Sequence, residues 1–300
     1  MYHRIADESF DPWALAVTPE NFLAQMEWLA ANRTVLPLSE FALRQRNGTL
    51  PAAAAAVTFD DGYACATKIA LPILERLGVP ATVFVPADLI DRGREFWWDE
   101  LEQLVLGTRE AELAVDGQSV ALGERSADDR RWRPNAQPAT PRQKAFHQLW
   151  SRLRVTPPAD LRAAMEHLRG QSSHRPAARE SHRPLTAEEA AGERSELLEW
   201  GSHALSHPSL PLLSSEEKRR EIVGSVERCA ALTGCIPKTF AYPYGDRDEE
   251  SEALVAEAGF VCGCTTQHRA VARKISPFAL PRVHVGNCGA DVLSRELRSL

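Results

Sequence analysis

The sequence contains no apolar run near the roughly 20 residues that a membrane-spanning helix requires. Its longest uninterrupted apolar stretch, Ala52–Val57, is far shorter. The start of the chain also lacks the basic and apolar regions of a signal peptide, so the chain as given is expected in the cytoplasm, an expectation that a truncated start would leave open. The sequence therefore predicts no transmembrane segment.

Basic runs and paired cysteines are missing as well. Only five of the 35 basic residues are lysines, and the basic residues are scattered among 41 acidic ones to give a formal net charge of −6, which argues against nucleic acid as a partner. The six cysteines include no CxxC pair, so buried reduced thiols are expected and a zinc–thiolate site is not. What remains is a chain of 300 residues, 44% of them apolar, that can bury a large core.

Short apolar runs alternate with helical patterns along most of the chain, which favours a parallel α/β architecture. The clearest unit consists of an apolar strand (Ala53–Phe59), the polar turn Asp60-Asp61-Gly62, a helix (Lys68–Leu77) and a second buried strand (Ala81–Val85). Further strands are predicted at Val35–Leu38, Glu196–Trp200, Lys238–Tyr242 and Phe260–Thr265, and further helices at Pro19–Asn32, Ser215–Leu232 and Glu249–Ala258.

The alternation breaks down between about residues 107 and 194, where the sequence is charged and interrupted by prolines. Two amphipathic segments, Gln143–Leu153 and Asp160–Leu168, predict a small helical insertion in a single catalytic domain that spans residues 1–300. Four histidines of the insertion show no metal-ligand spacing and are expected to face solvent: His147, His167, His174 and His182.

Two adjacent carboxylates, Asp60 and Asp61, follow an apolar strand directly, and Gly62 opens the turn after them. Parallel α/β folds place their sites at the carboxyl ends of strands. Because neighbouring side chains diverge, one carboxylate can bind a metal ion while the other faces the water that the metal activates. The alternative, that the pair only caps the following helix, fits the motif about as well when it is taken alone.

Two histidines four residues apart, His203 and His207, follow another short apolar strand. Imidazoles at this spacing can converge on one ion, and two nitrogens with one carboxylate suit a catalytic zinc site that keeps an open position. Alone, such a pair is more often surface decoration or helix filler. Together with the strand-end aspartates it favours a metal site.

These motifs resemble those of the polysaccharide deacetylases, also called NodB-homology or carbohydrate esterase family 4 hydrolases. Val57–Tyr63 (VTFDDGY) resembles the first family motif, Gly201–Pro208 (GSHALSHP) the histidine-rich second and Phe240–Gly245 (FAYPYG) the third. Segments near both ends are similar to members that carry a long insertion: Tyr2–Ile5, Asp11–Val17 and Leu280–Arg282. The resemblance covers most of the chain outside residues 107–194.

The fold that the resemblance implies is an irregular parallel (β/α) barrel of about seven strands with a helical insertion. Its first strand would consist of little more than Tyr2-His3. We expect either that the start is truncated or that the barrel begins with a stub that exposes a sheet edge.

The resemblance also implies a metal centre and a general base. Asp61, His203 and His207 would bind a divalent metal ion, with zinc expected from the ligand types and cobalt or nickel as alternatives. Asp60 would be the general base that accepts the proton of the attacking water, and the backbone N–H of Tyr244 would stabilise the oxyanion.

A proton donor for the leaving amine is expected on a late strand. His284 is the candidate, although its spacing differs from the family pattern and a half-buried structural histidine fits equally well. Arg282 would set the charge on Asp60, a task that the family gives to an arginine of the third motif, where this chain has Phe240-Ala241. His3, at the end of the expected first strand, is interpreted as structural.

Aromatic residues are expected to line the sugar site. Tyr242 and Tyr244 flank Pro243, which favours a shaped site wall, with plain strand aromatics as the alternative. Trp98 follows the strand Ala81–Val85 and either stacks on a sugar ring or anchors the insertion.

The predicted function is a metal-dependent hydrolysis that removes an N-acyl group, acetyl in the simplest case, from an amino sugar, an oligosaccharide or a glycan precursor. A deformylase or amidohydrolase acting on a small or lipid-linked substrate would use the same metal, base and oxyanion site. A catalytically silent barrel that binds a glycan is the rival from another class. The intact set of ligands and base argues against it, because buried charges without turnover are costly.

Overall fold

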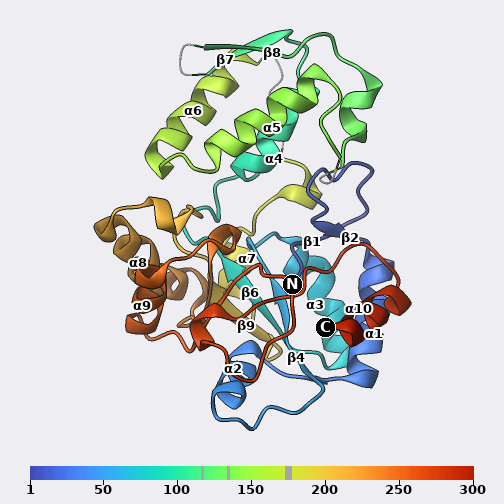
Figure 1. The fold of residues 1–300 in the computed structure, drawn as a ribbon, viewed down its shortest axis with the longest axis vertical. Coiled ribbons are helices and arrows are strands. Elements are labelled where there is room, and N and C mark those ends of the chain that lie inside the picture. The colour runs from blue at the N-terminus through green and yellow to red at the C-terminus, as the bar shows by residue number, and fades with distance from the viewer. Residues whose placement is uncertain (116–117, 134–135, 173–177) are drawn as a thin grey trace. The chain divides into compact units, whose positions relative to one another are not determined.

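The computed structural model describes residues 1–115, 118–133, 136–172 and 178–300, and the chain divides into two compact units (Figure 1). The first, here called the barrel unit, comprises Met1–Asp7, Leu15–Arg92 and Pro184–Leu300. The second, the helical unit, comprises Glu8–Ala14 and Gly93–Arg183. None of the helices within the described ranges combines the length and the apolar character that crossing a bilayer requires.

The barrel unit alternates short strands with helices. Its strands are β1 (Arg4–Ile5), β2 (Ala16–Val17), β3 (Thr34–Val35), β4 (Ala54–Ala55), β5 (Val57–Phe59), β6 (Ala81–Val85), β9 (Leu198–Ser202), β10 (Thr239–Ala241) and β11 (Cys262–Cys264). Its helices are α1 (Pro19–Asn32), α2 (Leu38–Arg46), α3 (Leu71–Leu77), α7 (Ala187–Gly192), α8 (Ser215–Thr233), α9 (Glu249–Glu257) and α10 (Ala290–Ser299). Five strands form one parallel sheet in the order β11-β10-β9-β6-β5, which confirms the predicted parallel (β/α) architecture.

The first residues of the chain extend this sheet beyond β5. Tyr2 forms a parallel bridge with Phe59. The Met1 nitrogen donates to the Val283 carbonyl at 2.8 Å, and the Val285 N–H donates to the Met1 carbonyl at 3.1 Å. The first segment therefore has hydrogen-bonded neighbours on both sides, and the expectation that it exposes a sheet edge is wrong.

The segment that covers this edge also reaches the opposite end of the sheet. Leu280 forms a parallel bridge with Cys264 of β11, and its N–H donates to the Gly263 carbonyl at 2.8 Å. Residues 280–285 thus lie between β11 and the first segment. The five strands and these two segments account for the barrel of about seven strands.

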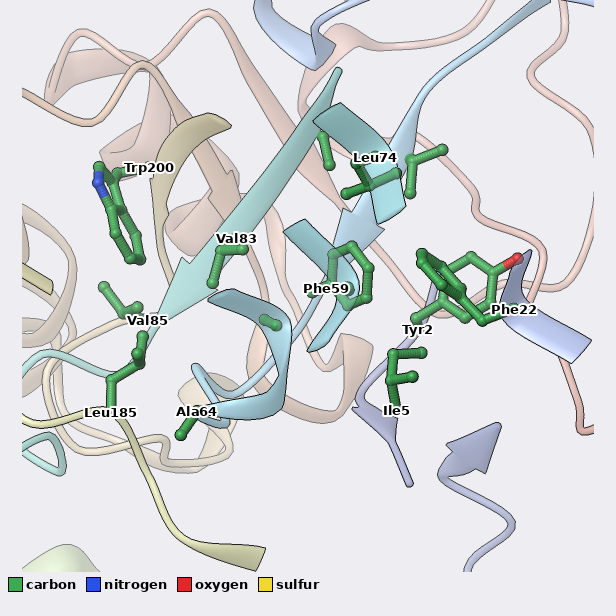
Figure 2. Packing of buried hydrophobic residues seen from close by; sticks show 14 of the residues in the cluster. Tyr2, Ile5, Phe22, Phe59, Ala64, Leu74, Val83, Val85, Leu185 and Trp200 are labelled. Carbon is green, nitrogen blue, oxygen red and sulfur yellow. The ribbon is translucent and has the colours of Figure 1, made fainter. Parts of the chain in front are cut away.

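Apolar side chains of the strands and the covering helices form the main core of the barrel unit (Figure 2). Tyr2, Phe22 of α1 and Phe59 of β5 pack with ring centroids 5.2, 5.6 and 5.8 Å apart. All five residues of β6 are buried, as expected for a strand covered on both faces. This packing fixes the carboxyl ends of β5 and β6.

Local capping signals set the helix boundaries. Thr18 accepts a hydrogen bond from the Asn21 N–H at the start of α1, and Pro19 occupies the first turn. Ser214 and Glu217 form a capping box at the start of α8. The helices predicted at Pro19–Asn32 and Ser215–Leu232 accordingly match α1 and α8 to within one residue.

The helical unit is larger than the expected insertion and begins earlier. It contains α4 (Trp97–Glu102), α5 (Pro141–Leu153), α6 (Pro158–Gln171) and an antiparallel pair that was not predicted, β7 (Glu112–Val115) and β8 (Gln118–Ala121). It runs from Gly93 to Arg183 instead of about 107 to 194, and it includes the distant loop Glu8–Ala14. The loop belongs to this unit because the Trp13 ring packs against two of its tryptophans, with ring centroids 4.3 Å from Trp150 and 5.5 Å from Trp132.

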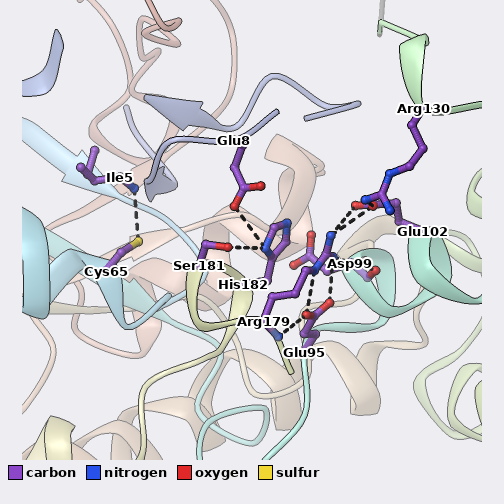
Figure 3. Close-up of polar contacts among 10 residues, drawn as sticks. All are labelled: Ile5, Glu8, Cys65, Glu95, Asp99, Glu102, Arg130, Arg179, Ser181 and His182. Carbon is purple, nitrogen blue, oxygen red and sulfur yellow. Dashed lines mark hydrogen bonds and ion pairs between the residues drawn. The ribbon is translucent and has the colours of Figure 1, made fainter. Parts of the chain in front are cut away.

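Buried ion pairs hold the helical unit together (Figure 3). Arg179 donates to both carboxylate oxygens of Glu95 at 2.9 Å and reaches Glu102 at 3.1 Å. Arg130 pairs with the same Glu102 at 3.0 Å. Because Glu95 and Glu102 are almost fully buried, these arginines are needed to compensate their charges.

One histidine of this unit was placed wrongly from the sequence. His182 is fully buried, with its Nδ1 2.9 Å from the Ser181 hydroxyl and 3.5 Å from Glu8 (Figure 3). Polar partners allow an imidazole to be buried, and one of them, Glu8, comes from a distant part of the sequence. His147 and His167 are exposed, as expected, whereas His174 lies outside the described residues.

Candidate metal centre

The candidate residues gather at the carboxyl ends of three parallel strands. Asp60 and Asp61 follow β5, His203 follows β9 and Tyr242 follows β10. The parallel register that pairs Phe240 of β10 with Ser202 of β9 places these strand ends at one edge of the sheet. This edge is where parallel α/β folds form their sites.

Three predicted metal ligands converge at this edge. The Asp61 Oδ1 lies 3.5 Å from the His203 Nε2 and 3.3 Å from the His207 Nε2. These ligand atoms lie within 4.8 Å of one another, and no other group of three His, Cys, Asp or Glu residues does so in the part of the chain that the structure describes. All three side chains are buried. Two imidazole nitrogens and one carboxylate oxygen at such distances can hold one divalent ion.

The tautomer of His203 supports this fit. Its Nδ1 lies 2.7 Å from the Ala241 carbonyl, which can only accept, so Nδ1 carries the proton. A neutral ring then presents the Nε2 lone pair toward the Asp61 carboxylate at 3.5 Å, the arrangement in which both atoms can bind one cation. The Ala241 carbonyl was not foreseen, because a backbone acceptor leaves no signal in the residue types.

The protonation states of the ligands also suit a metal ion. Burial raises the pKa of Asp61, but the adjacent His203 and His207 rings outweigh burial and hold that pKa well below its usual value. Burial lowers the pKa of His207, which favours the neutral ring that a metal needs. The carboxylate is therefore charged and the imidazole neutral near pH 7.

Backbone strain is concentrated at this site. Among the described residues only six non-glycine residues have positive φ, and four of them belong to the site motifs: Asp61 (71°), Ala204 (63°), His207 (59°) and Tyr244 (59°). Each costs about 1–2 kcal/mol relative to the right-handed region. Such conformations persist where the surrounding structure imposes them, and they cluster at functional sites.

Asp60, the second carboxylate of the motif, forms an ion pair with Arg282. The Nη1 and Nη2 atoms of Arg282 donate to the two Asp60 oxygens at 2.6 and 2.7 Å. The Nε of Arg282 donates to the Thr265 carbonyl at 3.0 Å, which orients the guanidinium. Burial raises the pKa of Asp60, but the lowering effects of Arg282 and His203 are larger, so the net pKa lies below its usual value.

His284 and His3 form a second pair beside the aspartates. Their rings meet edge to face with centroids 5.6 Å apart. Burial lowers the pKa of His3, although the Asp61 and Asp60 charges act in the opposite direction, and the structural interpretation of His3 stays a prediction. Burial and the neighbouring His3 lower the pKa of His284 to about 4. The role of His284 as proton donor stays a prediction.

His284 should make stability depend on pH. Its folded-state pKa of about 4 lies below the ordinary value of 6.5, so between these values the unfolded chain binds a proton that the folded chain does not. Stability should therefore fall as the pH drops from about 6.5 to about 4. In His284→Gln this part of the fall should disappear, which thermal unfolding of both proteins across that range measures.

The control for this measurement is His167→Gln, at an exposed side chain of the helical unit. This variant removes a solvent-exposed histidine, so the pH dependence of stability should stay that of the wild type. A wild-type pH profile in H284Q would contradict the proposed neutral state of half-buried His284.

Of the aromatic residues expected to line the sugar site, one contacts a candidate metal ligand and the other two are buried. Tyr244 packs edge-on against His207 with centroids 4.5 Å apart, whereas Tyr242 is fully buried and its hydroxyl donates to the Phe278 carbonyl at 2.9 Å. Trp98 is 5% exposed in the helical unit and stacks on Phe96 with centroids 4.9 Å apart. Sugar contacts for Tyr242 and Trp98 stay predictions.

Comparison with known proteins identifies the family. The family model for polysaccharide deacetylases matches residues 47–110 and 178–263, which together make up half of the chain. No curated protein sequence matches.

Solved structures with a similar fold include a Streptococcus pyogenes deacetylase in complex with acetate, with 16% identity and a TM-score of 0.58 over 99% of this chain and 95% of that one. A polysaccharide deacetylase from Bacillus cereus has 17% identity and a TM-score of 0.59 over 99% of this chain and 67% of its own. A de-N-acetylase from Aggregatibacter actinomycetemcomitans has 13% identity and a TM-score of 0.57 over 98% and 97%. The shared fold and the family match over half of the sequence lead to one conclusion: this chain belongs to the polysaccharide deacetylase family.

Proposed function

We propose that this chain is a metal-dependent hydrolase that removes an N-acyl group, acetyl in the simplest case, from the amino nitrogen of a sugar. The observation that carries the proposal is the convergence of Asp61, His203 and His207 beside a second carboxylate, Asp60, that is kept ionised. Membership of the polysaccharide deacetylase family supports an acylated carbohydrate as the substrate class.

The three ligands are assigned to a divalent ion. Two imidazole nitrogens with one carboxylate oxygen suit zinc, with cobalt and nickel as alternatives. When bound, such an ion polarises an amide carbonyl and lowers the pKa of water from about 15.7 toward about 7. The remaining steps depend on the chain's own residues.

Asp60 is assigned the role of general base. Its carboxylate is ionised, because its pKa is held low by Arg282, and it follows the strand end next to the ligand Asp61. It therefore can accept the proton of the attacking water. The oxyanion is assigned to the Tyr244 N–H, in a turn whose ring packs on the ligand His207.

The leaving amine needs a proton, which we assign to His284 with His3 beside it. With a pKa of about 4, His284 is neutral near pH 7. It can donate only after it has received a proton, and the proton taken up by Asp60 is the one that the reaction supplies. The His3 ring lies beside the His284 ring, with centroids 5.6 Å apart.

The test is acetate release from N-acetylated sugars and oligosaccharides by zinc-loaded protein, run beside chelator-treated protein and His203→Ala. Release that requires metal and is lost in H203A would support the proposal. Formate release from N-formylated sugars without acetate release would favour the deformylase. Bound metal without release of either acid would make the silent barrel the leading alternative.

The Tyr244 turn offers a more local prediction. Gly245 has φ +76°, and a Cβ there would lie 2.7 Å from the Thr266 backbone nitrogen, so Gly245→Ala must shift the turn. The Thr266 hydroxyl also donates to the Tyr244 carbonyl at 3.1 Å, so the shift should reach the Tyr244 N–H. We expect kcat to fall by about 10²-fold, the order expected for one oxyanion donor, with zinc affinity retained.

The matched control is Gly234→Ala. Gly234 has a similar φ of +73°, but a Cβ there would meet nothing within 4 Å. This variant should lose about 1 kcal/mol of stability from the left-handed conformation, with kcat unchanged. A wild-type kcat in G245A would exclude the Tyr244 N–H as oxyanion donor.

A further inference from the structure

A buried carboxylate on α8 holds the loop between the two ligand histidines. Glu221 is 2% exposed. Its Oε2 accepts from the N–H of Leu205 at 3.0 Å and from that of Ser206 at 2.9 Å, while its Oε1 accepts from the Ser206 hydroxyl at 2.7 Å. One side chain thus binds every hydrogen-bond donor of two of the three residues that separate His203 from His207.

The carbonyl groups of the same loop are bonded by the segment that follows β6. The Ala204 carbonyl accepts from the Ala87 N–H at 3.2 Å, and the Leu205 carbonyl accepts from the Asp88 N–H at 2.9 Å. Because Ala204 and His207 both have left-handed backbone conformations, the loop needs contacts from outside to keep its shape. Glu221 supplies these contacts on the N–H side.

Glu221 gains no compensation from a cation. Its hydrogen bonds all come from the loop, and no Lys, Arg or His pairs with it anywhere in the described ranges. A buried carboxylate without an opposite charge costs free energy unless hydrogen bonds satisfy it. The next residue, Ile222, packs in an apolar cluster with Ala204, so the loop donors are the polar partners that satisfy the Glu221 carboxylate.

We propose that Glu221 is a positioning residue of the metal centre. By fixing Leu205 and Ser206 it sets the separation of the His203 and His207 rings before a metal ion arrives. The inference rests on the proposed function for the identity of the bound group. Its effect, however, falls on metal affinity and on the shape of the metal-free loop.

The experiment compares Glu221→Ala, Glu221→Gln and Ser206→Ala. We expect E221A to weaken zinc binding by about 10- to 100-fold, the usual cost of losing a group that orients metal ligands. E221Q should lose less, because its amide oxygen still accepts from both N–H groups. Chelator competition measures zinc affinity, and the visible absorption of Co²⁺ reports ligand geometry. In the metal-free protein, amide exchange at Leu205 and Ser206 should speed up in the same order.

The control is Lys218→Met on the same helix. Lys218 is buried and pairs with Asp248 and Glu250, neither of which belongs to the loop, so its loss should lower the melting temperature and leave zinc affinity unchanged. If E221A binds zinc as tightly as wild type, the proposal fails. Should E221A not fold, wild-type zinc affinity in both E221Q and S206A would overturn it equally. A lack of acetate release would refute the proposed substrate without altering these comparisons.

Discussion

Replacing Asp60 by asparagine is expected to lower kcat/KM for deacetylation by about 10²- to 10⁴-fold, the range that a positioned general base contributes. The amide keeps the shape of the carboxylate but cannot take up a proton near pH 7. The ligands Asp61, His203 and His207 are unchanged, so zinc affinity should stay near the wild-type value. Steady-state kinetics and chelator competition on the same preparations measure the two effects.

The matched control is Asp291→Asn. Asp291 is an exposed carboxylate on α10 that pairs with Arg295, so its amide should have wild-type kinetics. If D60N keeps the wild-type kcat/KM, the base must lie elsewhere, and the His3–His284 pair becomes the next candidate.

Local elements were predictable where apolar periodicity and capping residues agree. β6 matches its prediction at both ends, and the Thr18 cap marks the start of α1. The prediction of a strand at Val35–Leu38 was wrong at its end, since β3 stops at Val35 and α2 begins at Leu38. There Leu38 and Ala42 bury one face in the sheet core at helical spacing, so tertiary burial decided between strand and helix.

Long-range closure could not be predicted in the same way. The pairing of Met1 with Val283 and Val285 joins residues more than 280 positions apart, and no residue pattern in either segment indicates the other as its partner. The same holds for the loop Glu8–Ala14, which joins the helical unit through Trp13. Sequence patterns specify the elements, whereas these contacts depend on the geometry of the whole chain.

The candidate metal ligands were suggested by residue type and spacing, because a metal site would need those atoms. The partner of Asp60 could be suggested only indirectly, since Arg282 lies in the segment 280–285 and not in the third motif, where the family carries its arginine. Glu221 had no signal at all. It acts through backbone N–H groups, and its residue type does not distinguish it from the exposed acids Glu216 and Glu227 on the same helix.

Removing the guanidinium of Arg282 is expected to destabilise the metal-free protein at pH 7 by about 3–5 kcal/mol, the cost of leaving one member of a buried ion pair alone. Arg282 donates to both oxygens of Asp60, which is 3% exposed. Arg282→Met retains an apolar side chain without the charge. Chemical denaturation of chelator-treated protein measures the loss.

The loss should depend on pH with a definite sign. In the wild type the Asp60 pKa lies below the ordinary 3.8, so the ionised pair contributes stability above that value and loses it as the pH falls through the folded-state pKa. Without Arg282, burial dominates and raises the Asp60 pKa. R282M should therefore be less destabilised relative to wild type at acidic pH than at pH 7, and the acidic limb of its kcat/KM profile should move to higher pH.

The double variant D60N/R282M tests whether the pair acts as a unit. Replacing both partners removes the buried charges together, so the double variant should be more stable than the two single effects predict, by about 0.5–3 kcal/mol. Arg295→Met, at an exposed side chain, should change stability by no more than about 0.5 kcal/mol. If the effects of D60N and R282M simply add, the charge on Asp60 is set without Arg282. His203 and His3 would then be left as the groups that keep Asp60 ionised, because they are the other groups that lower its pKa.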